Sequence, residues 1–226
     1  MPDRGPANAR NRLRDRQRGR LRGLYVIVDP EHTDGRSAED VARAALDGGA
    51  TVIQLRDKVS DKGPMLETAV RINELCHAAG ALFFMNDHAD VALLSGADGL
   101  HVGQTDLPVA AARRVLSEGQ MIGTSNHQVQ EALISLADEV DYIAVGAIYG
   151  TGTKEVTVSA GLETLARIRA EVDCPIAAIG GINASNVAAV VEAGADMVCV
   201  ISAVCRAADP ASATRELVEL IDRVRS

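Results

Sequence analysis

Short apolar runs alternate with longer amphipathic segments from Leu24 to the C-terminus. Eight of these runs are five to seven residues long, and most are hydrophobic on both faces, which is typical of strands buried in a parallel sheet. The predicted strands are 24–29, 51–56, 81–86, 98–102, 121–125, 142–148, 175–180 and 197–202.

The segments between these runs carry apolar residues at helical spacing, and most of them close with glycine or aspartate. They are 38–49, 64–80, 108–119, 128–140, 162–172 and 184–195. Eight strands joined by helical crossovers over about 200 residues predict a single α/β domain, a (β/α)8 TIM barrel over residues 23–226. A dinucleotide-binding fold is disfavoured, because "DPEHTDG" follows the first strand where GxGxxG would be needed.

Residues 1–22 differ in composition from the rest of the chain. They hold eight arginines against Asp3 and Asp15, so this arm carries about +6, while the remainder carries about −14 (the net −8 minus 6). With so little apolar surface to bury, we expect the arm to be disordered. It could bind a polyanion or resemble a transit peptide, but a solvated extension without a role in chemistry is favoured. The acidic body argues against nucleic acid as the main ligand.

The remaining composition favours a cytoplasmic globular protein. The chain has 226 residues, is 47% hydrophobic and has no apolar run near the 18 residues that a membrane span needs. Its 4 cysteines form no CxxC pair and come with no secretory signal, so we expect buried free thiols rather than disulfides or a zinc site. Membrane partners are not expected, and the sequence leaves a homo-oligomer open.

Polar residues follow the second predicted strand in the stretch "QLRDK". Gln54, Arg56 and Lys58 alternate, and side chains two positions apart along a strand point to the same face. Because active sites of this fold lie at the carboxyl ends of the strands, we expect this face to be the barrel mouth. Two cations there suit an anionic, phosphorylated substrate, whereas a barrel-closing layer of ion pairs is the structural alternative.

Carboxylates follow the third and fourth strands. Asp87 stands in "MND" beside Asn86, and Asp106 stands in "HVGQTD", where Gln104 is a weaker candidate polar contact. Hard oxygen ligands next to cations suit Mg²⁺ that carries phosphate oxygens, and a diphosphate fits best. Asp106 alone could instead cap the helix that follows.

The later strands predict a second anion site. The fifth strand delivers Ser125, and the loop after the sixth, "TGTK" (151–154), offers hydroxyl groups, glycine amides and Lys154. Gly181 and Ser202 follow the seventh and eighth strands, where this fold recurrently binds phosphate. One site therefore suits a metal-bound diphosphate and the other a monophosphate.

In this order, "QLRDK", "MND", "HVGQTD", "GTSNH", "TGTK", "AIGGI" and "VISA" resemble the thiamine-phosphate synthase family, over roughly residues 24–223. The resemblance implies a (β/α)8 enzyme that joins 4-amino-2-methyl-5-hydroxymethylpyrimidine diphosphate to 4-methyl-5-(2-phosphoethyl)thiazole and releases diphosphate. It implies Mg²⁺ on Asp87 and Asp106, and catalytic roles for Arg56, Lys58, Ser125 and Lys154. The implied pyrimidine contacts are Gln54, Leu55, Arg56, Asp57, Lys58, Asn86, Ser125 and Lys154, and the implied thiazole contacts are Thr151, Gly152, Thr153, Gly181, Ile201 and Ser202.

The chain departs from the family pattern at Tyr149 and Gly150, where Phe-Pro is usual, and the loss of proline loosens that loop. The implied chemistry needs no general base, so His101 and His127 near the mouth are expected to be structural. A thiazole tautomerase paralogue and a non-catalytic barrel with an RNA-binding arm are the alternatives. The combined presence of Lys58, Asp87, Asp106 and Lys154 argues against the tautomerase.

Overall fold

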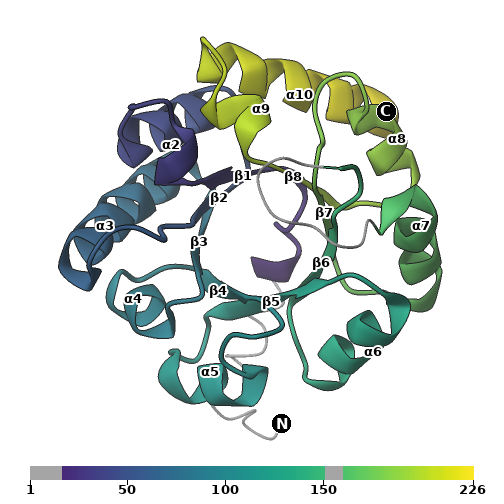
Figure 1. Ribbon diagram of the computed structural model, residues 1–226, viewed down its shortest axis with the longest axis horizontal. Coiled ribbons are helices and arrows are strands. Elements are labelled where there is room, and N and C mark those ends of the chain that lie inside the picture. The colour runs from purple at the N-terminus through teal and green to yellow at the C-terminus, as the bar shows by residue number, and fades with distance from the viewer. Residues whose placement is uncertain (1–16, 151–159) are drawn as a thin grey trace, which may run out of the picture.

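The chain folds into a closed barrel of parallel strands that is surrounded by helices (Figure 1). The computed structural model describes residues 17–150 and 160–226. The strands follow one another around the barrel in chain order, so the predicted (β/α)8 barrel is confirmed. The strands are β1 (Gly23–Val28), β2 (Val52–Leu55), β3 (Leu82–Asn86), β4 (Gly99–Val102), β5 (Met121–Asn126), β6 (Tyr142–Gly146), β7 (Ile176–Ile179) and β8 (Met197–Val200).

The six predicted helical segments each overlap an observed helix. Those helices are α2 (Ala38–Asp47), α3 (Lys62–Ala79), α5 (Val109–Val115), α6 (Val129–Ala137), α7 (Gly161–Glu171) and α8 (Val187–Glu192). The helices that the segments above do not include are η1 (Pro30–His32), α4 (Ala89–Leu94), α9 (Ser202–Cys205) and α10 (Pro210–Arg225). Three of these four have six residues or fewer, which is too short for a helical period to show.

The long C-terminal helix α10 packs against elements from both the beginning and the end of the barrel. Asp209 caps it by accepting a hydrogen bond from Ser212 N at 3.1 Å, and Pro210 occupies the first turn, where its missing N–H costs nothing. Leu217 and Ile221 on its inner face are buried. The helix packs against α2, α8 and β1, so it covers the place where the last strand of the barrel meets the first.

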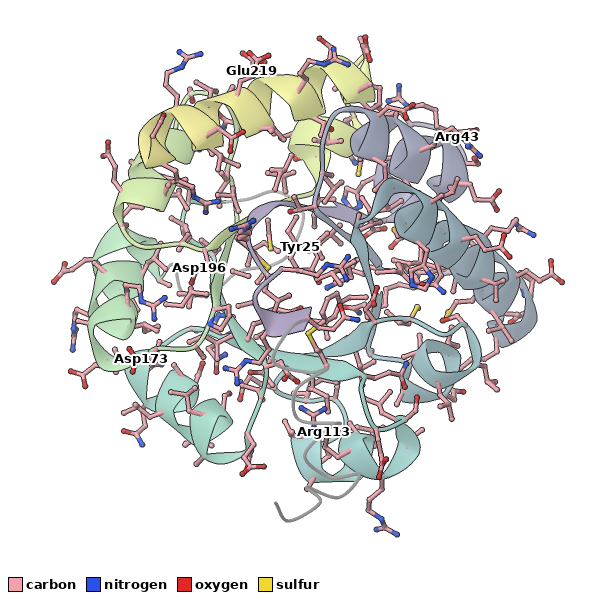
Figure 2. All side chains as sticks on the ribbon, turned by 180° about the vertical axis from the view of Figure 1, so that it is seen from behind. Tyr25, Arg43, Arg113, Asp173, Asp196 and Glu219 are labelled. Carbon is pink, nitrogen blue, oxygen red and sulfur yellow. The ribbon has the colours of Figure 1, made fainter. Side chains whose placement is uncertain are left out.

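The strands carry two separate layers of apolar side chains. Tyr25 and Ile27 of β1 belong to a cluster inside the barrel, whereas the alternate residues Leu24 and Val26 belong to the larger cluster between the strands and the helices. Figure 2 shows Tyr25 within the ring of strands, while Arg43 and Glu219 extend outward from the helices. This alternation decides which residues reach the barrel mouth.

Two glycines make room for aromatic rings inside the barrel. A Cβ atom at Gly123 would lie 2.0 Å from Cζ of Tyr142, and one at Gly99 would lie 2.3 Å from Cε1 of Phe84. The rings of Phe84 and Tyr142 therefore pack edge to face, with centroids 5.4 Å apart. The missing Cβ atom of Gly123 thus leaves the Tyr142 ring its place inside the barrel.

Residues 17–22, which the sequence assigns to the disordered arm, instead pack against the barrel. Leu21 is 2% exposed and lies in the inner cluster with Tyr25. Gln17 donates to Asp98 Oδ1 at 3.3 Å, and an Arg20 guanidinium nitrogen donates to Gly80 O at 3.1 Å. The prediction was wrong for these residues because Leu21 packs into the inner apolar cluster, although the arm as a whole has little apolar surface. Residues 1–16 lie outside the described residues.

The prediction for the cysteines is confirmed by the structure. All four cysteines are buried free thiols, as expected. No helix in residues 17–150 and 160–226 has the length and apolar character needed to cross a membrane.

Candidate active site

The carboxyl ends of the strands surround a cavity of about 560 Å³. Seven of the predicted site residues line it and come from five different strands or the loops that follow them. They are Gln54, Arg56, Asn86, Ser125, Gly181, Ile201 and Ser202. The structure therefore brings them together at the barrel mouth, and their contacts with a substrate remain predictions.

The stretch that follows β2 divides between the cavity and the barrel wall. Gln54 and Arg56 point inward and line the cavity. Leu55 lies in the outer apolar cluster, and Asp57 is 3% exposed with its Oδ1 accepting from Val59 N and Ser60 N. Burial opposes ionisation of Asp57, but hydrogen bonds from the side chain and the N–H of Ser60, together with that from Val59 N, outweigh it and lower its pKa. The side chains of Leu55 and Asp57 thus turn away from the cavity, and Asp57 organises the loop instead.

A buried carboxylate holds the Arg56 guanidinium at the cavity wall. Asp29, directly after β1, has a fully buried side chain whose Oδ2 contacts Arg56 Nη1, while 17% of the Arg56 side chain is exposed. The other oxygen accepts from Glu31 N at 3.0 Å and lies 3.4 Å from His32 Nδ1. Because Asp29 is anchored on both oxygens, it fixes the direction in which Arg56 presents its remaining N–H groups.

Lys58 and Asp87 form an ion pair between the ends of β2 and β3. Lys58 Nζ contacts Asp87 Oδ2, and the two side chains are 39% and 11% exposed. Asp87 has a left-handed backbone with φ of 61° and donates its N–H to His101 O at 2.8 Å. These contacts place Asp87 between β3 and β4, next to the cavity-lining residues Asn86 and His101.

Asp106 stabilises the loop after β4. Its Oδ2 accepts from Gly103 N at 2.9 Å, and the N-cap of α5 is Pro108, so the alternative that Asp106 caps this helix is wrong. Neither Asp87 nor Asp106 lines the cavity within the described part of the chain. Among the described residues, no group of three or more histidine, cysteine, aspartate or glutamate side chains could hold a metal ion. A cation on these two carboxylates would need oxygens from a ligand to complete its coordination.

A continuous chain of hydrogen bonds crosses the floor of the cavity. Gln54 Nε2 donates to Tyr25 Oη at 2.6 Å, and Tyr25 Oη lies 3.0 Å from Tyr142 Oη. Tyr142 Oη lies 2.9 Å from His101 Nδ1, and His101 Nε2 lies 2.9 Å from Ser125 Oγ. The chain joins β2 to β5 through β1, β6 and β4, and all five of its residues line the cavity.

The two tyrosines in this chain stay protonated. Burial raises the pKa of Tyr25 far above its ordinary value, and the nearby Cys199 raises it further, although the hydrogen bonds from Tyr142 and Gln54 lower it in part. Burial also raises the pKa of Tyr142, and Tyr25 adds to the effect. Each phenol therefore keeps a single O–H and can donate one hydrogen bond.

The side of the cavity formed by β7 and β8 includes two adjacent glycines beside larger side chains such as Ile182 and Arg206. Gly180 and Gly181 have φ of 109° and 63°, values that other residues adopt only with strain. A Cβ atom at Gly181 would lie 2.8 Å from Gly150 O and 2.8 Å from Tyr149 Cβ. The predicted site residues Thr151, Gly152, Thr153 and Lys154 lie outside the described residues.

Some residues that line the cavity or contact its lining were not predicted as site residues from the sequence: among them, His127 and Arg206 line it, and Asp29 contacts Arg56. Asp29 continues the inward alternation of Tyr25 and Ile27, so the period of two could have revealed it. His127 lines the cavity with its Nδ1 2.5 Å from Gly146 O, which agrees with a structural role. Arg206, in the short segment after α9, also lines the cavity, and its sequence context carries no signal for this position.

Comparison with known proteins gives one consistent result. The family model described as thiamine monophosphate synthase matches residues 24–204. A thiamine-phosphate synthase of Moorella thermoacetica is 46% identical over 203 residues, which cover 89% of this chain and 97% of that protein. One of Methanoculleus marisnigri is 47% identical over 199 residues, which cover 88% and 94%. A solved thiamine phosphate pyrophosphorylase from Pyrococcus furiosus superimposes with a TM-score of 0.86 at 36% identity, covering 93% of this chain and all of that one.

Proposed function

The chain belongs to the thiamine-phosphate synthase family, and we propose that the mouth of its barrel is where the reaction of that family takes place. The protein is a transferase that makes thiamine monophosphate from a pyrimidine diphosphate and a thiazole phosphate and releases diphosphate. The comparisons do not support a tautomerase or a non-catalytic RNA-binding barrel.

The division of the cavity into two arcs carries this assignment. Polar side chains from β2, β3 and β5 form one arc, with Gln54, Arg56, Asn86 and Ser125. Glycines and a serine after β7 and β8 form the other, with Gly181 and Ser202. The first arc suits a charged leaving group with a polar ring, and the second lets backbone amides approach a phosphate closely. We assign the pyrimidine diphosphate to the first arc and the thiazole phosphate to the second.

The first arc would favour departure of the diphosphate. When the bond between the pyrimidinylmethyl carbon and the diphosphate oxygen breaks, negative charge develops on the leaving group. Arg56, oriented by Asp29, and Lys58 would stabilise that charge, and Lys154 is assigned the same role from its sequence motif. Preorganised cations of this kind stabilise the transition state more than the bound substrate.

The two aspartates fit a magnesium ion. Asp87 and Asp106 each use Oδ2 for a contact within the protein, and no hydrogen bond from the described residues reaches the Oδ1 of either. Carboxylate oxygens are the ligands that Mg²⁺ prefers, and the ion would neutralise charge on diphosphate oxygens when bound. Lys58 beside Asp87 would hold the leaving group next to this site.

The second arc would place the nucleophile. The thiazole nitrogen attacks the pyrimidinylmethyl carbon without first losing a proton, so the reaction needs no general base. Phosphate contacts at Gly181 and Ser202 would hold the thiazole in position, and positioning alone can lower a barrier substantially. With four buried free thiols, the protein is suited to a reducing compartment, and we assign it to the cytoplasm.

Substitution of Arg56 tests the assignment of the first arc. Arg56→Ala should lower kcat/KM for the pyrimidine diphosphate by about a hundredfold, because a buried charged hydrogen bond to the leaving group is lost. Arg43→Ala, on the exposed face of α2, is the matched control and should leave kcat/KM unchanged. A decrease in kcat/KM smaller than about threefold for Arg56→Ala would be well below the loss expected for one key stabilising group. It would contradict the assignment of the diphosphate to this arc.

A further inference from the structure

The hydrogen-bond chain across the cavity floor has a direction. The amide nitrogen Gln54 Nε2 can donate hydrogen bonds but cannot accept them, so it donates to Tyr25 Oη. The single O–H of Tyr25 can then donate to Tyr142 Oη. The proton of Tyr142 is then left for His101 Nδ1. With Nδ1 as the acceptor, neutral His101 carries its proton on Nε2 and donates it to Ser125 Oγ.

This direction sets what the two ends of the chain offer to a ligand. Gln54 has its amide nitrogen turned to Tyr25, so its carbonyl oxygen remains as an acceptor. Ser125 Oγ receives a proton from His101, so its own O–H can donate into the cavity. One end therefore accepts and the other end donates.

Reversal at one end would reverse every bond. If the group at position 54 accepted from Tyr25, Tyr142 would donate to Tyr25, and His101 Nδ1 would carry the proton and donate to Tyr142. His101 Nε2 would then accept from Ser125, which would become an acceptor for the ligand. A mixed arrangement, in which one phenol accepts from both of its neighbours in this chain of bonds, would leave that buried phenol O–H without an acceptor among the four contacts, which is energetically costly.

We propose that Tyr25, Tyr142 and His101 act as positioning residues that couple the hydrogen-bond polarity of Gln54 to that of Ser125, and that this coupling selects an aminopyrimidine over an oxopyrimidine. The proposal rests on the assignment of the pyrimidine to this arc of the cavity. An aminopyrimidine offers an amine donor and a ring-nitrogen acceptor, which match the acceptor at Gln54 and the donor at Ser125. An oxopyrimidine offers the opposite pair, and it would leave the buried polar groups at Gln54 and Ser125 without suitable partners.

The burial of the hydrogen-bond chain explains why its donor-to-acceptor direction would persist. Gln54, Tyr25 and Tyr142 are 2%, 1% and 0% exposed. Water therefore has little access to these atoms and cannot easily supply the missing donor or acceptor if one bond reverses. A buried network of this kind has few satisfied arrangements, and its polarity is fixed by its ends.

The tautomer of His101 is the direct readout, because a merely structural network would not require a particular one. We would measure it by 15N NMR of histidine-labelled protein at about pH 8.5, where an ordinary histidine is neutral. The unmodified protein should show His101 protonated on Nε2. His127, whose Nδ1 lies 2.5 Å from Gly146 O, should show a proton on Nδ1 and serves as the internal reference.

Two variants test whether the polarity is transmitted. Gln54→Glu places an acceptor next to Tyr25 and should move the His101 proton to Nδ1 while the His127 signals stay unchanged. The double variant Tyr25→Phe/Gln54→Glu removes the connecting phenol, so His101 should keep its proton on Nε2. A His101 proton on Nδ1 in the unmodified protein would contradict the coupling between Gln54 and Ser125. The same tautomer in all three proteins would also contradict it.

Selectivity is the second measurement. The ratio of kcat/KM for the aminopyrimidine diphosphate to that for its oxo analogue should fall by about tenfold in Gln54→Glu, because Ser125 changes from a hydrogen-bond donor to an acceptor toward the substrate. A tautomer change without a change in this ratio would overturn the selectivity part. Because the NMR measurement needs no substrate, a failure of the coupling is distinguishable from a failure of the proposed function.

Discussion

The Asp29 carboxylate is fully buried and forms an ion pair with the Arg56 guanidinium at the wall of the barrel mouth. Asp29→Asn keeps the size of the side chain but removes its charge. We expect kcat/KM for the pyrimidine diphosphate to fall by about tenfold, because Arg56 would no longer be held toward the leaving group. Steady-state kinetics with this substrate varied and the thiazole phosphate saturating would measure the effect.

A second aspartate provides the control. Asp90 lies 2.7 Å from Lys62 Nζ in an exposed ion pair, and such pairs contribute little. Asp90→Asn should therefore keep normal kinetics. Unchanged or improved kinetics for Asp29→Asn would contradict the positioning role of Asp29.

Asp87→Ala tests the assigned magnesium site. Loss of an assigned ligand should lower turnover by about a hundredfold or more, as expected when one key electrostatic stabiliser of a transition state is removed. Asp90→Ala, which alters an exposed partner of Lys62 on α4, should leave turnover unchanged. Circular dichroism of both variants would check that the fold is intact. Full turnover of the unmodified protein in EDTA would contradict a role for the metal.

Gly181→Ala tests the phosphate side of the cavity. The added Cβ would meet Gly150 O and Tyr149 Cβ at 2.8 Å, and the backbone φ of 63° already disfavours a side chain. We expect the KM for the thiazole phosphate to rise by at least about tenfold, since the loop must shift by a few tenths of an ångström or more. Gly63→Ala, whose Cβ would have no neighbour within 4 Å, is the matched control. A larger effect on the pyrimidine KM than on the thiazole KM would show that the two arcs are wrongly assigned.

Leu21→Ala tests whether residues 17–22 belong to the folded barrel. Leu21 is 2% exposed among the apolar side chains inside the strands, so its truncation should lower the free energy of unfolding by about 2–4 kcal/mol. Leu94→Ala, with 66% of that leucine exposed, should change it by less than about 0.5 kcal/mol. Urea denaturation would compare the two variants. Equal stability of both variants would contradict the conclusion that residues 17–22 pack as part of the folded barrel.

The strand pattern was enough to predict the barrel and much of its mouth. Alternation along β2 placed Gln54 and Arg56 inside correctly, because a strand has a period of two wherever it folds. The same rule applied to Leu55 and Asp57 would have turned both side chains away from the cavity. Their assignment came from the resemblance, which concerns a stretch of sequence and not the direction of each side chain.

The hydrogen-bond chain could not be predicted from the sequence. Tyr25 and Tyr142 are 117 positions apart and meet inside the barrel, where Gly123 leaves room for the Tyr142 ring. Such a contact depends on the register of five strands, which local patterns do not determine. The packing of Leu21 was missed for a similar reason, because composition describes the arm as a whole and not its last residues.

Product formation by the purified protein tests the central assignment most directly. The protein would be incubated with the pyrimidine diphosphate, the thiazole phosphate and Mg²⁺, and the mixture would be analysed by mass spectrometry for thiamine monophosphate. We predict thiamine monophosphate and diphosphate in equal amounts, no product when either substrate is omitted, and a loss of about a hundredfold in Arg56→Ala. Absence of thiamine monophosphate with both substrates and Mg²⁺ present, or full activity of Arg56→Ala, would contradict the account.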